Sequence, residues 1–191
     1  MEEIRAFIAI ELPDDIREGL GRLIARLNSN QPEVKWVDPS AIHLTLKFLG
    51  YVAPDRIAEI TEAITDVAER IPPFSLEIKG LGVFPGLNRV RVVWVGVEGY
   101  TDKLLHLQKG VETNLEILGF PPEERDFTPH LTLARVRENA SPAERQELGH
   151  LITATEVPVI GSFTAMSVSL MRSQLARTGA VYTRMAAFEL K

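Results

Sequence analysis

Apolar and polar residues alternate with the two-residue period of β-strands along much of the chain. β-Branched and aromatic residues are frequent in these stretches, which favours strands further. The predicted strands cover residues 4–10, 41–49, 74–78, 90–97 and 131–136, with a short extended segment at 34–37. Two more strand-like stretches lie in the C-terminal tail, at 166–171 and 181–188.

Four other stretches carry apolar residues three and four positions apart, the spacing of one helix face. They span residues 16–27, 57–67, 104–118 and 142–152. Pro13, Pro54 and Pro142 stand at three of their starts, where a proline is well tolerated. Helices and strands therefore alternate irregularly, and the strand pairs read as antiparallel. We expect an α+β fold rather than a doubly wound parallel sheet.

One tetrapeptide, His-Leu-Thr-Leu, occurs twice. It occupies residues 43–46 and 130–133, so the copies lie 87 residues apart in a chain of 191. With four histidines in the chain, such a repeat should arise by chance in about one of a thousand chains of average composition. A proline-led helix follows each copy. The repeat predicts two lobes related by approximate two-fold symmetry within one domain over residues 1–191, and it leaves open to which lobe the final strands return.

The repeated motif places chemistry on one face of each strand, because residues two apart on a strand point to the same side. His43, Thr45 and Lys47 should share one face, and His130 and Thr132 another. Imidazole has an unperturbed pKa near 6.5, so two of them suit a reaction that removes one proton and delivers another. Threonine hydroxyls can donate hydrogen bonds to anionic oxygens. Metal-free in-line hydrolysis of a phosphodiester fits this set.

Each copy alone has a simpler interpretation, since a strand histidine is more often structural and threonine is a good strand former. The duplication, with polar residues on the same face both times, favours function.

Composition narrows the possible partners and compartments. The chain has 21 basic and 26 acidic residues, a net charge of −5, and no cysteine. These values exclude a basic nucleic-acid coat, disulfides, thiol nucleophiles and cysteine metal sites. No apolar run approaches the length of a membrane span, and the N-terminal residues do not resemble a targeting peptide. We therefore expect a soluble cytoplasmic protein.

With both motifs intact, the sequence resembles the two-histidine phosphoesterases. Within them it is similar to the bacterial and archaeal RNA 2′,3′-cyclic phosphodiesterases, long called 2′-5′ RNA ligases, whose signature is one HxTx motif per lobe. The similarity covers most of residues 1–137 and is less distinctive in the final third. Its longer stretches are residues 5–10, 36–37, 43–50, 93–97 and 128–135.

The resemblance implies a bilobal fold with a cleft between two antiparallel sheets flanked by helices. It implies that the protein opens an RNA-terminal 2′,3′-cyclic phosphate to a 2′-phosphate, with no metal or cofactor. His43 and His130 would be the catalytic pair; we favour His130 as base and His43 as acid, although the sequence does not decide this. Thr45 and Thr132 would hold the phosphate oxygens.

Arg135, five residues after the second motif histidine, would bind phosphate by the same resemblance. Strict alternation, however, places Arg135 with Leu131 and Leu133, away from His130. Either the strand twists or bulges after Leu133, or Arg135 is a surface residue with another part.

Several other residues have both a functional and a structural interpretation. Lys47 could add charge near the phosphate or lie at the rim of the site. Phe7 could stack on a base, although core packing is the commoner role for such a residue. Arg91, with Arg89 beside it, and Arg125 could contact RNA phosphates or form a solvated surface.

Three alternatives stay open at this point. A zinc site would need a third ligand such as Asp126 beside the two histidines, and a threonine two residues on is a poor metal partner. End joining of RNA through a 2′-5′ bond would use the same site, and a non-catalytic nucleotide-binding module is the third possibility. The expected partners are RNA ends or nucleoside 2′,3′-cyclic phosphates, with no membrane. The acidic balance predicts contact with one or two nucleotides, and we take a monomer as the working expectation.

Overall fold

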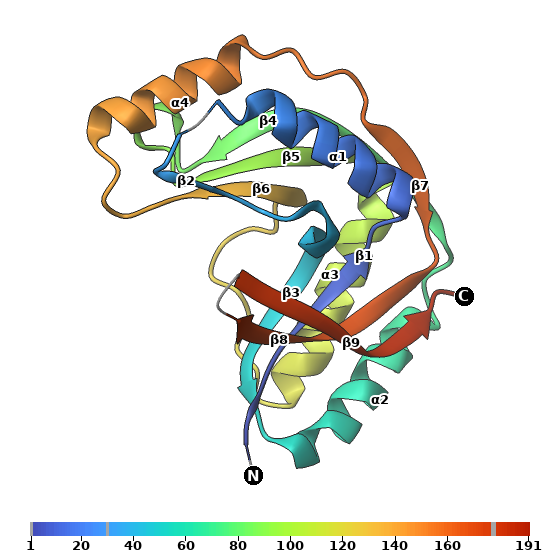
Figure 1. The fold of residues 1–191 in the computed structure, drawn as a ribbon. Coiled ribbons are helices and arrows are strands. Elements are labelled where there is room, and N and C mark those ends of the chain that lie inside the picture. Colours follow the sequence, from blue (N-terminus) through green and yellow to red (C-terminus); the bar gives the residue numbers. More distant parts are fainter. Residues whose placement is uncertain (1, 30, 177–178) are drawn as a thin grey trace.

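The computed structural model describes residues 2–29, 31–176 and 179–191, and its strands form two antiparallel sheets (Figure 1). Sheet A has the strand order β3-β1-β8-β9, and sheet B has the order β2-β6-β5-β4-β7. The strands are β1 (Ile4–Glu11), β2 (Val34–Trp36), β3 (His43–Val52), β4 (Phe74–Phe84), β5 (Val92–Gly99), β6 (His130–Val136), β7 (Gly161–Ala165), β8 (Ser167–Ala176) and β9 (Gly179–Glu189).

The helices lie where the apolar spacing predicts them. They are α1 (Asp14–Leu27), α2 (Ile57–Ala68), α3 (Thr101–Ile117) and α4 (Pro142–Ala154), with short 3₁₀ turns η1 (Pro39–Ala41), η2 (Pro54–Arg56) and η3 (Leu87–Arg89). α4 begins with a capping box. Ser141 Oγ accepts from the backbone N–H of Glu144, and the Glu144 carboxylate accepts from the backbone N–H of Ser141. Two backbone donors at the helix start are thereby satisfied.

The two sheets are covered by different helices. α1 and α4 pack on sheet B, whereas α2 and α3 pack on sheet A (Figure 1). α1 follows β1 of sheet A but contacts β7 of sheet B, and α3 follows β5 of sheet B but contacts β3 of sheet A. Each sheet is therefore covered in part by a helix that follows, along the chain, a strand of the other sheet. The tail is shared in the same way, since β7 joins sheet B and β8 and β9 join sheet A.

This architecture confirms the expected fold class: α+β, with two antiparallel sheets flanked by helices in a bilobal arrangement. The main core lies between each sheet and its helices and includes fully buried Ile8, Leu44, Val95 and Leu131. Burying one such side chain stabilises the fold by roughly 1.5–3 kcal/mol. The opposite face of sheet A carries only a small apolar cluster, Phe7, Ala9 and Met171 with Tyr182 beside it. The helix-free faces are thus available for a site.

The strands differ from the sequence prediction at two places. β4 continues to Phe84 through the glycine-rich stretch that we expected to be a connection, and its pairing with β5 shifts between Lys79 and Leu81. Gly80, the extra residue, has φ 75°, a conformation that glycine adopts without strain. β7 was not predicted, because its five residues, GSFTA, are too short and too weakly apolar to give a pattern.

A β-bulge interrupts β3 inside the first motif strand. Thr45 pairs with Ala9 of β1, but Lys47 pairs with the very next β1 residue, Ile8, so Leu46 is the extra residue. Beyond a bulge the alternation of faces is shifted by one residue. Leu46 and Lys47 accordingly both lie on the buried side.

The second motif strand has a bulge at the equivalent position. Thr132 pairs with Trp94 of β5 and Ala134 pairs with Val93, which leaves Leu133 as the extra residue. Leu133 and Ala134 are both fully buried. The third residue after each histidine is therefore the inserted one in both copies.

Candidate functional site

The two histidines begin the two motif strands. His43 is the first residue of β3 in sheet A, and His130 is the first residue of β6 in sheet B. The strands contact each other across the two sheets, as Figure 1 shows where η1 leads into β3 beside β6. A hydrogen bond from Val37 N–H to the Leu133 carbonyl ties the segment before η1 to β6. The fold thus brings together two motifs that lie far apart along the chain.

Each imidazole is held by the same local contact. His43 Nδ1 lies 2.9 Å from the carbonyl oxygen of Ala41, and His130 Nδ1 lies 2.6 Å from that of Thr128. A carbonyl oxygen only accepts, so Nδ1 carries the hydrogen in both rings. Nε2 of each neutral ring is then left with a lone pair. Both histidines present the same atom for proton transfer.

Aromatic side chains flank the His43 ring. The centroid of Phe7, from β1, lies 4.6 Å away, and that of Tyr182, from β9, lies 4.9 Å away with its plane at 87° to the imidazole. Phe7 and Tyr182 also meet edge to face, with their centroids 5.1 Å apart. The rings of Phe7 and Tyr182 limit rotation of His43 about its side-chain bonds.

Burial lowers the pKa of His43 to about 4. The hydrogen bond to Ala41 opposes this shift, Arg17 adds to it through like-charge repulsion, and the carboxylate of Glu11 opposes it. Glu11 lies directly across the β1–β3 pair from His43. In the free protein at neutral pH, His43 is therefore uncharged.

His130 has a different aromatic surround. The Phe84 ring meets it edge to face at 5.0 Å, and the Trp94 ring lies 6.2 Å away. Trp94 lies over Gly82 of β4, where a Cβ atom would overlap the indole ring. Gly96, not an acid, faces His130 across the β5–β6 pair. The two lobes thus repeat the histidine anchor but not its electrostatic surroundings.

Thr45 and Thr132 lie where the motif predicts, two residues after each histidine on the same face, and both are half-buried. Arg135 joins them because of the bulge at Leu133. It pairs with Val92, on the face opposite the buried Val93, and its side chain is exposed. Of the two explanations left open by the sequence, the bulge is the one that the structure contains.

The expected place of Lys47 beside His43 is wrong. The bulge at Leu46 turns Lys47 into the protein, where it is 1% exposed. Its Nζ donates to Glu112 Oε2 at 3.0 Å and to the Pro121 carbonyl at 2.8 Å. Lys47 therefore ties β3 to α3 and to the segment after it, and its ammonium group is not available to RNA.

The suggestion that Phe7 stacks on a base is also wrong, because Phe7 is only 2% exposed. The exposed aromatic residue is Phe48, which pairs with Phe7 across the strands, has its ring centroid 6.0 Å away, and is 55% exposed. Phe48 follows the bulge as Arg135 follows the second one. Strict alternation from His43, Thr45 and Lys47 would place Phe48 on the opposite face, in the core, so only knowledge of the bulge could have identified it.

Arg91 is exposed and immediately precedes β5. In the β5–β6 pair, this end of β5 lies beside Arg135, whereas His130 is four pairs further along β5. It does not lie with the histidines. Arg125 and Asp126 are exposed residues of the segment between α3 and β6. Within the described ranges, no three histidine, aspartate or glutamate side chains are grouped to hold a metal ion.

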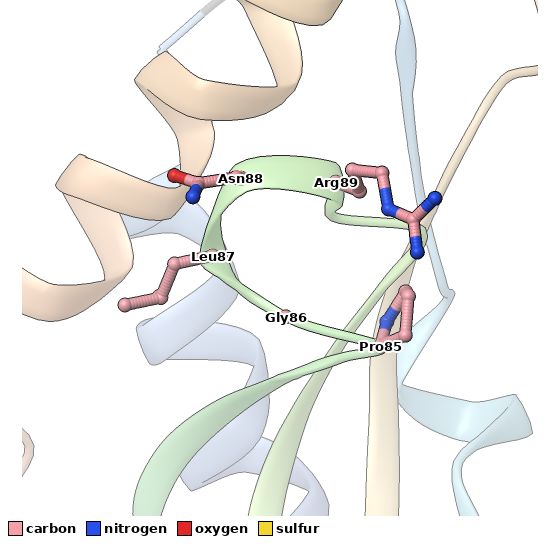
Figure 2. A pocket seen from close by; sticks show the side chains of 5 residues that line it. All are labelled: Pro85, Gly86, Leu87, Asn88 and Arg89. Carbon is pink, nitrogen blue, oxygen red and sulfur yellow. The ribbon is translucent and has the colours of Figure 1, made fainter.

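Two open cavities of the structure lie away from the two histidines. One, of about 180 Å³, is formed by five consecutive residues of the β4–β5 connection, Pro85 to Arg89 (Figure 2). Another, of about 260 Å³, lies between α2 and the end of β9. Neither of these two cavities is lined by a histidine. No helix in the described part of the chain has the length and apolar character needed to cross a membrane.

Comparison with known proteins identifies the family. The profile described as LigT-like phosphoesterase matches residues 10–94 and, separately, residues 95–182, with one HLTL motif in each range. The chain belongs to this family. A relative of this LigT-like phosphoesterase from Methanothermobacter thermautotrophicus, named RNA 2′,3′-cyclic phosphodiesterase, is 37% identical over 188 residues that cover 98% of this chain and 100% of that protein. A protein of the same name from Aquifex aeolicus is 30% identical, with 100% and 99% coverage.

Solved structures show the same fold. A Thermus thermophilus protein superposes on the LigT-like phosphoesterase with a TM-score of 0.81 and 27% identity over 98% of each chain. Escherichia coli LigT, crystallised with 3′-AMP, gives a TM-score of 0.80 and 27% identity over 100% of this chain and 99% of that one.

Proposed function

We propose that this LigT-like phosphoesterase hydrolyses the 2′,3′-cyclic phosphate at an RNA terminus and leaves a terminal 2′-phosphate. The observation that carries the proposal is the pair of imidazoles, anchored alike through Nδ1 at the starts of two adjoining strands. The relatives named RNA 2′,3′-cyclic phosphodiesterase, similar over the full length of the chain, support the same substrate.

The proposed reaction is an in-line displacement at phosphorus. His130 Nε2 takes a proton from a water molecule while the oxygen of that water forms the new bond to phosphorus. The bond from phosphorus to O3′ breaks on the opposite side, and His43 donates a proton to O3′. One water is consumed, and the products are a 2′-phosphate and a free 3′-hydroxyl. Exchange of protons with solvent then restores both rings.

The phosphate is held by neutral and charged donors. The hydroxyls of Thr45 and Thr132, on the two motif faces, donate to its non-bridging oxygens, and Arg135 supplies the positive charge. The proposed site uses no metal and no cofactor. Phe48, the exposed aromatic beyond the first bulge, offers a ring face to the base next to the phosphate.

The lowered pKa of His43 constrains its proposed role. A neutral His43 cannot act as an acid until it gains a proton, so binding of the anionic phosphate must raise its pKa. An NMR titration of the free protein and of its complex with adenosine 2′-phosphate measures this directly. We expect a higher pKa in the complex; an unchanged value would reverse the roles and make His43 the base.

The proposal further assigns RNA ends as partners, a monomer as the active form and the cytoplasm as location. Incubation with the four nucleoside 2′,3′-cyclic phosphates, followed by phosphorus NMR, tests the reaction. We expect nucleoside 2′-phosphates, formed equally fast in the presence of a chelator. A 3′-phosphate product, or tight binding without turnover, would contradict the proposal. Mixing an RNA half that ends in a cyclic phosphate with a 5′-hydroxyl half tests for 2′-5′ joining.

A further inference from the structure

Two positive side chains face each other across a strand pair at the far end of the site face. Lys35 of β2 is paired directly with Arg135 of β6, and both are exposed. Directly paired residues of antiparallel strands share a face, with Cβ atoms about 4.5–5.5 Å apart. Like charges in such a pair destabilise the sheet. An anion lying between them would remove that cost.

More cations surround this pair. Arg135 pairs on its other side with Val92. Arg91, the residue before Val92, is at the same end of the sheet but on the other face, because its carbonyl accepts from Val136, whose side chain packs on the core. A further cation, Arg89, is the last residue of η3. Figure 2 shows its side chain on the opposite side of the loop from Leu87. Arg89 and Arg91 are both exposed. Four cations thus gather at one end of sheet B in a chain whose net charge is −5.

These charges are not neutralised by the protein. Across residues 2–29, 31–176 and 179–191, the side chains of the four cations form no ion pair with an acid. The nearest acid to Lys35 along the chain is Glu33, the residue before β2. The backbone carbonyl of Glu33 accepts a hydrogen bond from the backbone N–H of Arg137. Arg137 adds a further positive charge there, and its Nε donates to the Pro32 carbonyl. The cluster is therefore net positive.

We propose that Lys35 and Arg89 bind the phosphodiesters of single-stranded RNA upstream of its cyclic terminus. The inference rests on the proposed function, because it takes the terminal phosphate to lie at the histidines. Arg135 lies between the two regions: it is on the face of His130 and Thr132, and it is paired with Lys35. A strand of RNA leaving the histidines along β6 meets Arg135 first, and Lys35 and Arg89 lie beyond it.

The proposed contacts extend recognition beyond the one or two nucleotides that the acidic balance of the chain predicts. Exposed cations on a sheet end contact the backbone rather than the bases, so the contribution is independent of sequence. Binding through phosphates also releases counterions, which makes it dependent on salt.

The test compares two substrates of one enzyme. One is adenosine 2′,3′-cyclic phosphate, which has no upstream phosphodiester, and the other is a hexaribonucleotide that ends in a 2′,3′-cyclic phosphate. We expect kcat/KM for the hexamer to exceed that for the nucleotide and to fall with salt, with a logarithmic slope steeper by about 0.7 per phosphate contacted. A hexamer with neutral methylphosphonate linkages should lose the preference.

Two variants identify the residues. Lys35→Ala and Arg89→Ala should each lower the ratio of the two kcat/KM values by about three- to tenfold and flatten the salt slope. The matched control is Lys109→Ala. Lys109 is an exposed cation of α3, on the side of sheet A that the helices cover, and its substitution should leave the ratio unchanged. If the enzyme cleaves both substrates with equal kcat/KM at low salt, or if Lys35→Ala and Arg89→Ala both keep the wild-type ratio, the proposed binding of upstream phosphodiesters is refuted while the proposed function stands. If neither the nucleotide nor the hexamer is cleaved, the proposed function itself fails.

Discussion

His43 and His130 are anchored by the same hydrogen bond, from Nδ1 to the carbonyl of the residue two positions earlier. In each copy the histidine is the first residue of its strand, so that carbonyl is outside the strand ladder and available to the ring. The two copies of the motif therefore hold their histidines in the same tautomer, with the hydrogen on Nδ1. In both rings Nε2 is left without a hydrogen, so the same atom of each histidine is the one that can take or deliver a proton.

Gly82 keeps Trp94 in place beside His130, and its substitution tests that packing. A Cβ in Gly82→Ala would overlap the Trp94 ring, so we expect a loss of about 1–3 kcal/mol in the free energy of unfolding. Displacement of the aromatic neighbour of His130 should also lower kcat/KM by roughly tenfold or more. Gly86→Ala is the control, because a Cβ there meets no atom within 4 Å. Equal stability and activity of the two variants would refute this account of Trp94.

Lys47 is a structural residue rather than a substrate contact, and its substitution should separate stability from activity. Lys47→Met leaves the Glu112 carboxylate without its partner, so we expect a loss of about 3–5 kcal/mol in the free energy of unfolding, measured by urea titration. The double variant Lys47→Met with Glu112→Leu should recover much of it. At a temperature where the variant is folded, kcat/KM should stay near wild type. A selective rise in KM would return Lys47 to the site.

The lowered pKa of His43 makes the stability of the fold depend on pH. As pH falls below about 6.5 the unfolded chain gains a proton at this ring first, and the folded protein does so only near pH 4. Its contribution is therefore complete above pH 6.5 and is lost as pH falls through 4. We expect wild type to lose more stability than His43→Gln between pH 7 and pH 4, by on the order of 2–3 kcal/mol. The exposed His106→Gln should follow wild type; parallel curves for wild type and His43→Gln would contradict the shift.

Phe48 should contribute to binding of the nucleoside. Phe48→Ala removes the exposed ring, and we expect KM for the four nucleoside 2′,3′-cyclic phosphates to rise by about five- to fiftyfold, since stacking of one base is worth roughly 1–3 kcal/mol. Phe48→Trp should restore most of the affinity. An alanine variant with wild-type KM would show that the base lies elsewhere.

The helices, most strands and the pairing of the two motifs could be predicted from the sequence. Apolar spacing is unambiguous where a whole face is buried, as in α1, and the repeated tetrapeptide indicated which strands should meet. The strand order could not be read in the same way, because α1 and α3 each pack on the sheet that they do not follow.

The two bulges explain most of the differences between the predicted and the observed positions of the site residues. At Leu46 and at Leu133 one inserted residue exchanges the two faces of the strand, so Lys47 points inward and Arg135 points to the site. Apolar residues surround both positions, and a run of buried residues reads equally well with or without an insertion. A charged residue that alternation assigned to the core, Arg135, was the one local sign that a bulge was needed.

The central claim, that both histidines carry the proton transfers, is tested most directly by His43→Ala and His130→Ala. We predict that each variant keeps a folded circular dichroism spectrum and loses about 10²–10⁴-fold in kcat towards adenosine 2′,3′-cyclic phosphate. A folded variant of either kind that retains a kcat near the wild-type value would contradict the account.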